Sequence, residues 1–200
     1  MDTVVFTQTT DKLNFQSVVD NYSIVKRDYQ WAVDNDFWFD YVHDIDVSSD
    51  IDPSVFTRNG NFWKVVPLIL KGEVLEFLPA QLKNSFTVST LLSLDVKPVL
   101  AIFSILDPHS DIDPHSDHDD EIVLDTKHIP HNERNDSVVK YHLGLDVYDD
   151  GLAGLVVDDI DQPVQEGVLS AFNETTVHWA YNHTSKPRGV LIVSYLNSQL

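Results

Sequence analysis

The chain contains no cysteine. Disulfide bridges, a thiolate nucleophile, zinc sites built on thiolates and iron–sulfur clusters are therefore excluded. Any metal must be held by histidine and carboxylate side chains, of which the chain has 9 and 32.

Basic residues are scarce: 13 Lys and Arg stand against 32 Asp and Glu, a formal net charge of −19. Sequence-independent binding to nucleic-acid phosphates needs a basic protein surface, and so does binding to an anionic membrane. The composition therefore predicts neither a nucleic acid nor a membrane as partner. We interpret the acidity as an adaptation for solubility or for a saline environment.

Long apolar segments are also missing. Runs such as Val65–Leu70 and Val190–Val193 are too short to span a bilayer, and no basic stretch followed by an apolar run opens the chain. We expect a soluble, cytoplasmic protein. No linker divides the 200 residues, which predicts a single domain 1–200, with an N-terminal extension over about 1–60 and a β-barrel core over 61–200.

One helix is expected in the first half of the chain. Over residues 79–95, Leu82, Phe86, Leu91 and Leu94 recur at spacings near 3.6. The first 60 residues also hold an aromatic cluster, which we interpret as part of a core or of a subunit contact. Its members are Trp31, Phe37, Trp38, Phe39 and Tyr41.

Short apolar or alternating segments separated by turn residues dominate elsewhere, and they predict an antiparallel sandwich or barrel preceded by a small helical part. The expected strands are Asn61–Leu70, Val99–Leu106, Val138–Val147, Leu152–Val157, Gly167–Phe172, Thr176–Tyr181 and Arg188–Leu196. Pro67 places the first of them near a sheet edge. In Val138–Val147 the odd-numbered apolar residues share one face and Lys140, His142, Gly144 and Asp146 the other. Asp161-Gln162-Pro163 is expected to be a turn.

A short repeat stands out. Asp107-Pro108-His109-Ser110-Asp111 is followed, after Ile112, by the same five residues at 113–117. The repeat is either a slipped duplication in an acidic loop or a metal site.

A His-x-Asp sequence favours the metal site, because side chains at i and i+2 of an extended chain point the same way. With His178 from a distant strand, His115 and Asp117 would form a two-His-one-carboxylate set. Such a set leaves positions open for a 2-oxo acid and O₂ on Fe(II). Arg188, at the start of the last strand, can pair two-pronged with a carboxylate at the far end of the site, which suits a dicarboxylate cosubstrate.

Four motifs in order resemble the aspartyl/asparaginyl β-hydroxylase family over about residues 99–196. Family members carry Ser-x-Leu-x-Pro-x-x-x-Ile-x-Pro-His, matched from Ser104 to His115, and His-Leu-Gly-Leu, matched by 142–145. A Gly-to-His stretch with a central Phe is similar to 167–178, and an Arg ten residues beyond that His is similar to Arg188.

The resemblance implies a double-stranded β-helix (jelly-roll or cupin-like) barrel and an Fe(II)- and 2-oxoglutarate-dependent dioxygenase that hydroxylates an amino acid, free or in a peptide. It implies iron ligands at His115 and His178, with the carboxylate of Asp117, which some relatives lack, completing the set. Ser104 and Arg188 would hold the distal carboxylate of 2-oxoglutarate, and His142 would bind its metal-proximal end. Lys140 stands where many relatives have Arg, within the same cosubstrate site.

Several alternatives stay open. His109 also begins a His-Ser-Asp, and family spacing alone selects His115. Residues 118–137 are longer than the corresponding segment of the animal enzymes, and form either a lid over the substrate or an acidic loop. The competing function is a cupin-like barrel that binds a metal or ligand without turnover, or a structural jelly roll.

Overall fold

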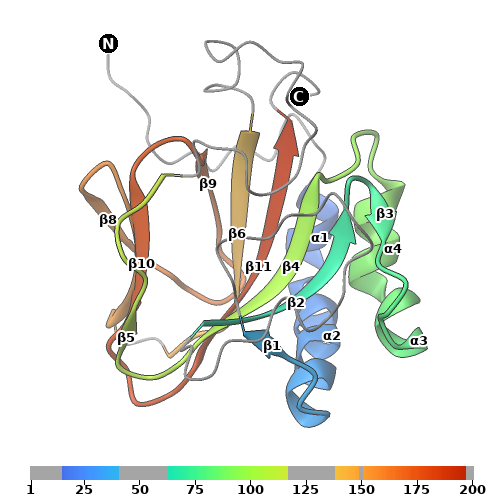
Figure 1. Cartoon of the computed structure of the whole chain (residues 1–200), viewed down its shortest axis with the longest axis horizontal. Coiled ribbons are helices and arrows are strands. Elements are labelled where there is room, and N and C mark those ends of the chain that lie inside the picture. The colour runs from blue at the N-terminus through green and yellow to red at the C-terminus, as the bar shows by residue number, and fades with distance from the viewer. Residues whose placement is uncertain (1–14, 41–62, 117–137, 149–150, 197–200) are drawn as a thin grey trace.

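Two β-sheets face each other, and a layer of helices covers the outer face of the larger one (Figure 1). The computed structural model describes residues 15–40, 63–116, 138–148 and 151–196. The fold is mainly β, of the cupin-like double-stranded β-helix class, with its two sheets open along their edges. The helices at the N-terminal side are the small helical part that the sequence predicts.

The large sheet has the strand order β1-β2-β4-β11-β6-β9, with β3 paired to β2. Its strands are β1 (Phe39–Asp40), β2 (Trp63–Leu70), β3 (Glu73–Val74), β4 (Leu100–Leu106), β6 (Val138–Asp146), β9 (Leu169–Asn173) and β11 (Arg188–Leu196). The small sheet has the order β5-β10-β7-β8. Its strands are β5 (Ser110–Asp111), β7 (Ala153–Val157), β8 (Ile160–Pro163) and β10 (His178–Asn182).

The helices pack on the outer face of the large sheet. They are α1 (Gln16–Asp20), α2 (Tyr22–Asp34), α3 (Ala80–Lys83) and α4 (Phe86–Ser93). Asp28 of α2 accepts hydrogen bonds from the backbone N–H and the hydroxyl of Thr87, at 2.9 and 2.7 Å, and so joins α2 to the first turn of α4. Tyr29 of α2 lies directly against Gly189 of β11, where any larger side chain would collide with its ring.

The single helix expected over 79–95 is instead two short helices. Asn84 ends α3, and Ser85 begins α4 by accepting a hydrogen bond from the backbone N–H of Val88 at 3.2 Å. The leucine spacing continues through this break, because both helices turn their apolar side toward the same core.

Two core clusters lie on the two faces of the large sheet. The outer face meets the helices in a cluster that includes Tyr29, Phe103, Leu143 and Leu191. The inner face meets the small sheet in a second cluster that includes Ile102, Leu155, Ala180 and Ile192. Alternate residues of β4, β6 and β11 therefore contribute to different cores.

The alternation predicted for 138–147 holds as far as Leu145 and then reverses. The ladder between β11 and β6 pairs Val190 with Gly144 but Gly189 with Asp146, so one residue is bulged out. A bulge turns the following side chains to the opposite face. As a result Val147 belongs to the inner core, and Asp146 lies on the helix side, 4.0 Å from Lys26.

The segment expected to be a turn at 161–163 is part of strand β8, which pairs with β7. The actual turn is Asp158-Asp159, both with positive φ. Pro67 lies in β2 between the short stretches that pair with β1 and with β3, at an irregularity in the β2–β4 ladder. The aromatic ring of Tyr41 lies outside the described residues, whereas Trp31, Phe37 and Trp38 pack against the helix-side core.

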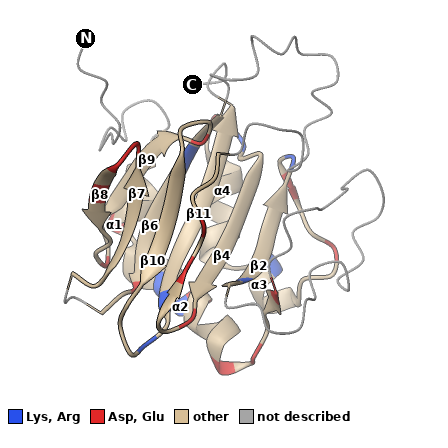
Figure 2. Ribbon diagram, turned by 60° about the vertical axis from the view of Figure 1, so that its left-hand side comes forward, with Lys and Arg blue, Asp and Glu red and all other residues tan. Residues whose placement is uncertain are grey.

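Charged residues lie mostly at strand ends and turns, and most of the two sheets carries neither sign (Figure 2). Within the described residues, no helix is long and apolar enough to cross a membrane.

Candidate active site

Strand β10 pairs with both copies of the repeat, at different positions along its length. The first copy places Ser110 and Asp111 opposite Asn182 and Tyr181. The second copy places His115 opposite His178, with backbone hydrogen bonds in both directions at 3.0 and 2.8 Å. The same extended chain therefore runs along β10 through both copies.

Of the two histidines in the repeat, only His115 is brought to His178. Their ring centroids are 4.4 Å apart. His109 instead lies in the exposed turn between β4 and β5 with a positive φ of 55°.

The two paired histidines are oriented in the same way. Nδ1 of His115 lies 2.7 Å from the carbonyl oxygen of Asp113, and Nδ1 of His178 lies 2.8 Å from that of Thr176. A carbonyl oxygen only accepts, so each Nδ1 carries the proton and donates. In the neutral ring the lone pair then belongs to Nε2, which is the form in which histidine binds a metal.

Arg188 is a buried cation on the inner face of the large sheet. It is 3% exposed, and its Nε and Nη2 are buried with no hydrogen-bond acceptor among the described residues. Burial lowers the pKa of Arg188 to about 10, which leaves it charged at neutral pH, and nearby Tyr181 acts in the opposite direction. A buried charge without a partner is costly, and an anion at this position would supply the acceptor that the described residues do not provide.

His142 lies on the same face, in the middle of β6. Both of its ring nitrogens are buried without a hydrogen-bond partner in the described part of the chain. Burial lowers its pKa well below the ordinary value, and Arg188, Lys140 and His178 lower it further. His142 is therefore a neutral ring with one donor and one acceptor to offer.

The ring of Phe172 links His142 to the histidine pair. Its centroid is 5.3 Å from that of His142 and 4.9 Å from that of His178. The buried phenyl ring therefore contacts both the candidate metal-binding histidine and the candidate cosubstrate-binding histidine.

Ser104 lies on β4, opposite Val190 of β11, which places it diagonally next to Arg188 on the inner face. Its hydroxyl oxygen accepts a hydrogen bond from the indole N–H of Trp63 at 2.8 Å. The hydroxyl proton of Ser104 can then be donated to a ligand.

Sequence reasoning missed Trp63. It lies inside the expected strand Asn61–Leu70, but no motif surrounds it, and its partner Ser104 is 41 residues further along the chain. The ladder between β2 and β4 places Trp63 opposite Leu106.

Lys140 also points to the inner face but is held by a carboxylate of the chain. Its Nζ lies 3.5 Å from Oε2 of Glu174, and both side chains are largely buried. Lys140 lies near His142, on the same face of β6. The sequence did not indicate Glu174 as its partner.

The third expected ligand, Asp117, lies outside the described residues, and so does the 118–137 segment. Within the described residues, no group of three or more His, Asp or Glu is close enough to hold a metal ion. Of the three expected metal ligands, the structure therefore describes two, His115 and His178.

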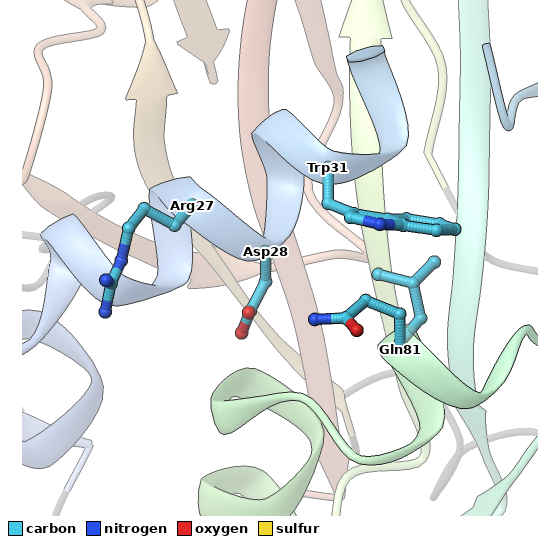
Figure 3. A pocket seen from close by; sticks show the side chains of 5 residues that line it. Arg27, Asp28, Trp31 and Gln81 are labelled. Atoms are coloured by element: carbon cyan, nitrogen blue, oxygen red, sulfur yellow. The ribbon is translucent and has the colours of Figure 1, made fainter. Parts of the chain in front are cut away.

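A separate depression lies on the helix layer (Figure 3). It is lined by Arg27, Asp28 and Trp31 of α2 and by Gln81 and Leu82 of α3. The large sheet separates it from the histidine pair, and Asp28 is already bound to Thr87. It is not part of the candidate site.

The fold and the inner-face residues define a cupin-like double-stranded β-helix protein. The chain belongs to the aspartyl/asparaginyl β-hydroxylase family, whose model matches residues 19–197. The match extends well beyond the half of the chain in which the motifs lie, and it includes α2 and β2. None of the curated proteins is a match.

Solved structures with similar folds share little sequence with the chain. A Cupin_2 domain of an XRE family transcriptional regulator from Enterobacter cloacae is 12% identical, with a TM-score of 0.41 over 68% of this chain and 97% of that one. A protein from Photorhabdus luminescens is 13% identical, with a TM-score of 0.41 over 79% and 89%. A predicted oxalate decarboxylase from Thermotoga maritima is 13% identical, with a TM-score of 0.38 over 67% and 80%.

Proposed function

We propose that the protein is an Fe(II)- and 2-oxoglutarate-dependent dioxygenase that hydroxylates an amino acid. The observation that carries the proposal is the buried guanidinium of Arg188, whose Nε and Nη2 have no hydrogen-bond partner among the described residues. It lies on the same sheet face as His142, whose two ring nitrogens have none there either. A hydroxylase family and a paired set of histidines support it.

The histidine pair fits a metal. His115 and His178 are on adjacent extended segments, and their Nδ1 contacts orient Nε2 for coordination. We assign the third ligand to Asp117, two residues after His115. Two histidines and one carboxylate suit Fe(II) and leave coordination positions for other ligands.

The polar atoms of Arg188 and His142 that have no partner among the described residues fit a dicarboxylate. The charged guanidinium of Arg188 and the hydroxyl of Ser104 would bind its distal carboxylate, and Trp63 would hold that hydroxyl in position. The neutral ring of His142 would donate to the end nearer the metal. Each of the groups that has no partner among the described residues would then gain one.

The bound iron would supply the oxidising chemistry that couples decarboxylation of 2-oxoglutarate to hydroxylation of a C–H bond. The protein would position the reactants and exclude water. The apolar side chains that surround the polar groups, such as Ile102, Val190 and Ile192, are buried between the sheets. Charge-assisted hydrogen bonds are strongest in such an environment.

The test uses purified protein with Fe(II), ascorbate, O₂ and 2-oxoglutarate. We expect slow succinate formation and, without O₂, a 2-oxoglutarate-induced absorption band. Arg188→Met should remove both at the same cosubstrate concentration, whereas Lys64→Met, which loses a cation in a surface ion pair, should keep them. Absence of succinate and of the band in the unmodified protein contradicts the proposal and favours a non-catalytic metal- or ligand-binding barrel.

A further inference from the structure

A buried serine lies beside His142 on the inner face of the large sheet. Ser170 of β9 is the direct cross-strand neighbour of His142 of β6, and each residue is only 7% exposed. Directly opposed side chains of an antiparallel pair lie on the same face, with their Cβ atoms about 4.5–5.5 Å apart. The hydroxyl of Ser170 and the imidazole of His142 therefore face the same space between the two sheets.

The sequence did not single out Ser170, because the motif of residues 167–178 is defined by its Gly, Phe and His. Alternation along β9 sends Leu169 and Ala171 into the helix-side core and Phe172 into the inner core. Ser170 therefore occupies an inner-face position among buried apolar and aromatic side chains. Burying a hydroxyl there costs free energy unless a hydrogen bond offsets it.

The two neighbours do not satisfy each other. A serine hydroxyl can donate to an imidazole nitrogen or accept from one, yet neither ring nitrogen of His142 has a hydrogen-bond partner among the described residues. Burial lowers the pKa of His142, so the ring is neutral and has one N–H to donate. The O–H of Ser170 and the N–H of His142 are thus two donors that lie side by side.

These two donors lie between the guanidinium of Arg188 and the histidine pair. Arg188 begins β11 four residues before the position opposite His142, about 13 Å away at the rise of a β-strand. In the other direction, the ring of Phe172, two residues after Ser170, contacts the rings of both His142 and His178. A ligand that extends from Arg188 towards the histidine pair therefore passes the two donors.

We propose that Ser170 is a further cosubstrate-binding residue, which donates to the carboxylate next to the oxo group of 2-oxoglutarate, beside the N–H of His142. The inference rests on the proposed function. With Arg188 and Ser104 at the distal carboxylate, the chain would then hold each end of the cosubstrate with two side chains. Two adjacent donors suit a carboxylate better than the neighbouring oxo group, because a carboxylate has two accepting oxygens and a charge that strengthens both hydrogen bonds.

The first experiment separates the two ends of the ligand. 4-Oxopentanoate keeps the distal carboxylate and the oxo group of 2-oxoglutarate but has a methyl group in place of the other carboxylate. With redox-inert Zn(II) present, calorimetric titration gives the Kd for 2-oxoglutarate, and displacement of 2-oxoglutarate gives the affinity for 4-oxopentanoate. Ser170→Ala should raise the Kd for 2-oxoglutarate about tenfold and change that for 4-oxopentanoate by less than about twofold. Arg188→Met should weaken both ligands.

Ser194 provides the matched control. It is also a buried serine of the large sheet, 3% exposed, and its hydroxyl donates to Oε2 of Glu174 at 3.4 Å. Ser194→Ala should leave the Kd for 2-oxoglutarate within about twofold of the unmodified protein. Equal losses in Ser170→Ala and Ser194→Ala would overturn the assignment, because they would reflect the removal of any buried hydroxyl from this sheet.

The second experiment uses the absorption band that 2-oxoglutarate induces with Fe(II) in the absence of O₂. Loss of a hydrogen bond to the carboxylate next to the oxo group should shift the wavelength of this band at saturating 2-oxoglutarate. A serine that serves only the fold would leave the wavelength unchanged. We expect a shift in Ser170→Ala and none in Ser194→Ala.

The outcomes keep the two proposals apart. Binding of 2-oxoglutarate that responds to Ser170→Ala, without any succinate formation, contradicts the dioxygenase and supports the role of Ser170. Succinate formation together with an unchanged Kd and an unchanged band in Ser170→Ala supports the dioxygenase and overturns the role of Ser170. Equal weakening of 2-oxoglutarate and 4-oxopentanoate in Ser170→Ala would overturn it as well, because the lost contact would then lie elsewhere on the ligand.

Discussion

The two faces of the large sheet are made by the same strands but bury different chemistry. On the helix side, β4, β6 and β11 contribute aromatic and aliphatic side chains, with Phe15 stacked on Tyr141 at 5.2 Å and Tyr29 edge-on to Phe103 at 5.8 Å. On the inner side, the same strands contribute Ser104, His142 and Arg188 among aliphatic residues. One face therefore holds the fold together. The other presents polar groups, of which the ring of His142 and Nε and Nη2 of Arg188 have no hydrogen-bond partner among the described residues.

This difference separates stability from ligand binding within single strands. In β6, Leu143 faces the helices and its neighbour His142 faces the small sheet. Substitutions one residue apart should therefore affect different properties.

The largest effect is expected at the histidine pair. His178→Ala should abolish activity and lower metal affinity by more than roughly 100-fold, because loss of groups that only orient a ligand already costs about 10–100-fold. Metal-binding titration measures this. His109→Ala is the control, since that side chain is exposed in a turn away from His178, and equal losses in the two variants would show that the ligand has been assigned to the wrong copy of the repeat.

Leu143→Ala should affect only stability. The side chain is fully buried against the helices, and its truncation should lower the free energy of unfolding by about 2–5 kcal/mol. Urea denaturation measures the change. The folded fraction should keep its affinity for 2-oxoglutarate, and a weakened affinity at temperatures where the variant is folded would contradict the separation of the two faces.

Arg188→Met should have the opposite pattern, weakening 2-oxoglutarate binding without lowering stability. Loss of two charge-assisted hydrogen bonds should raise the Kd for 2-oxoglutarate by roughly 100-fold or more. The melting temperature of the ligand-free protein should stay the same or rise, because a buried charge without a partner is replaced by an apolar side chain. A large fall in that melting temperature would mean that Arg188 has a structural role.

Trp63→Phe should give a smaller effect on the same ligand. Removing the indole N–H costs the hydrogen bond that holds the Ser104 hydroxyl, worth about 1 kcal/mol, so the Kd for 2-oxoglutarate should rise about fivefold. Calorimetric titration beside the Ser104→Ala variant tests the connection. If Trp63 acts only through Ser104, the double variant should be no weaker than Ser104→Ala alone.

The sequence predicted most of the strands, the family and which residues share each face of most of β6, because these depend on alternation and on motifs that are local in the chain. It mistook part of β8 for a turn. His115 could be chosen over His109 only through motif spacing, and the pairing of His115 with His178 provides a geometric reason for that choice. Trp63 and Glu174 were not predicted, because no motif surrounds Trp63, and the motif of residues 167–178 is defined by its Gly, Phe and His and not by Glu174. The faces of Asp146 and Val147 were predicted wrongly because a bulge leaves no clear mark on the alternation.

The smallest effect is expected at Tyr29, and it shows what an unpartnered group means on the other face. Its hydroxyl is buried with no hydrogen-bond partner among the described residues, and burial raises its pKa. Such a hydroxyl is unfavourable, so Tyr29→Phe should leave the free energy of unfolding unchanged or raise it by up to about 1 kcal/mol. Turnover of 2-oxoglutarate should not change. On the inner face, removing a polar group without a partner among the described residues would weaken ligand binding, which marks it as part of a ligand site. On the helix face, removing such a group would only relieve an unfavourable burial. Loss of turnover in Tyr29→Phe would contradict this difference between the two faces.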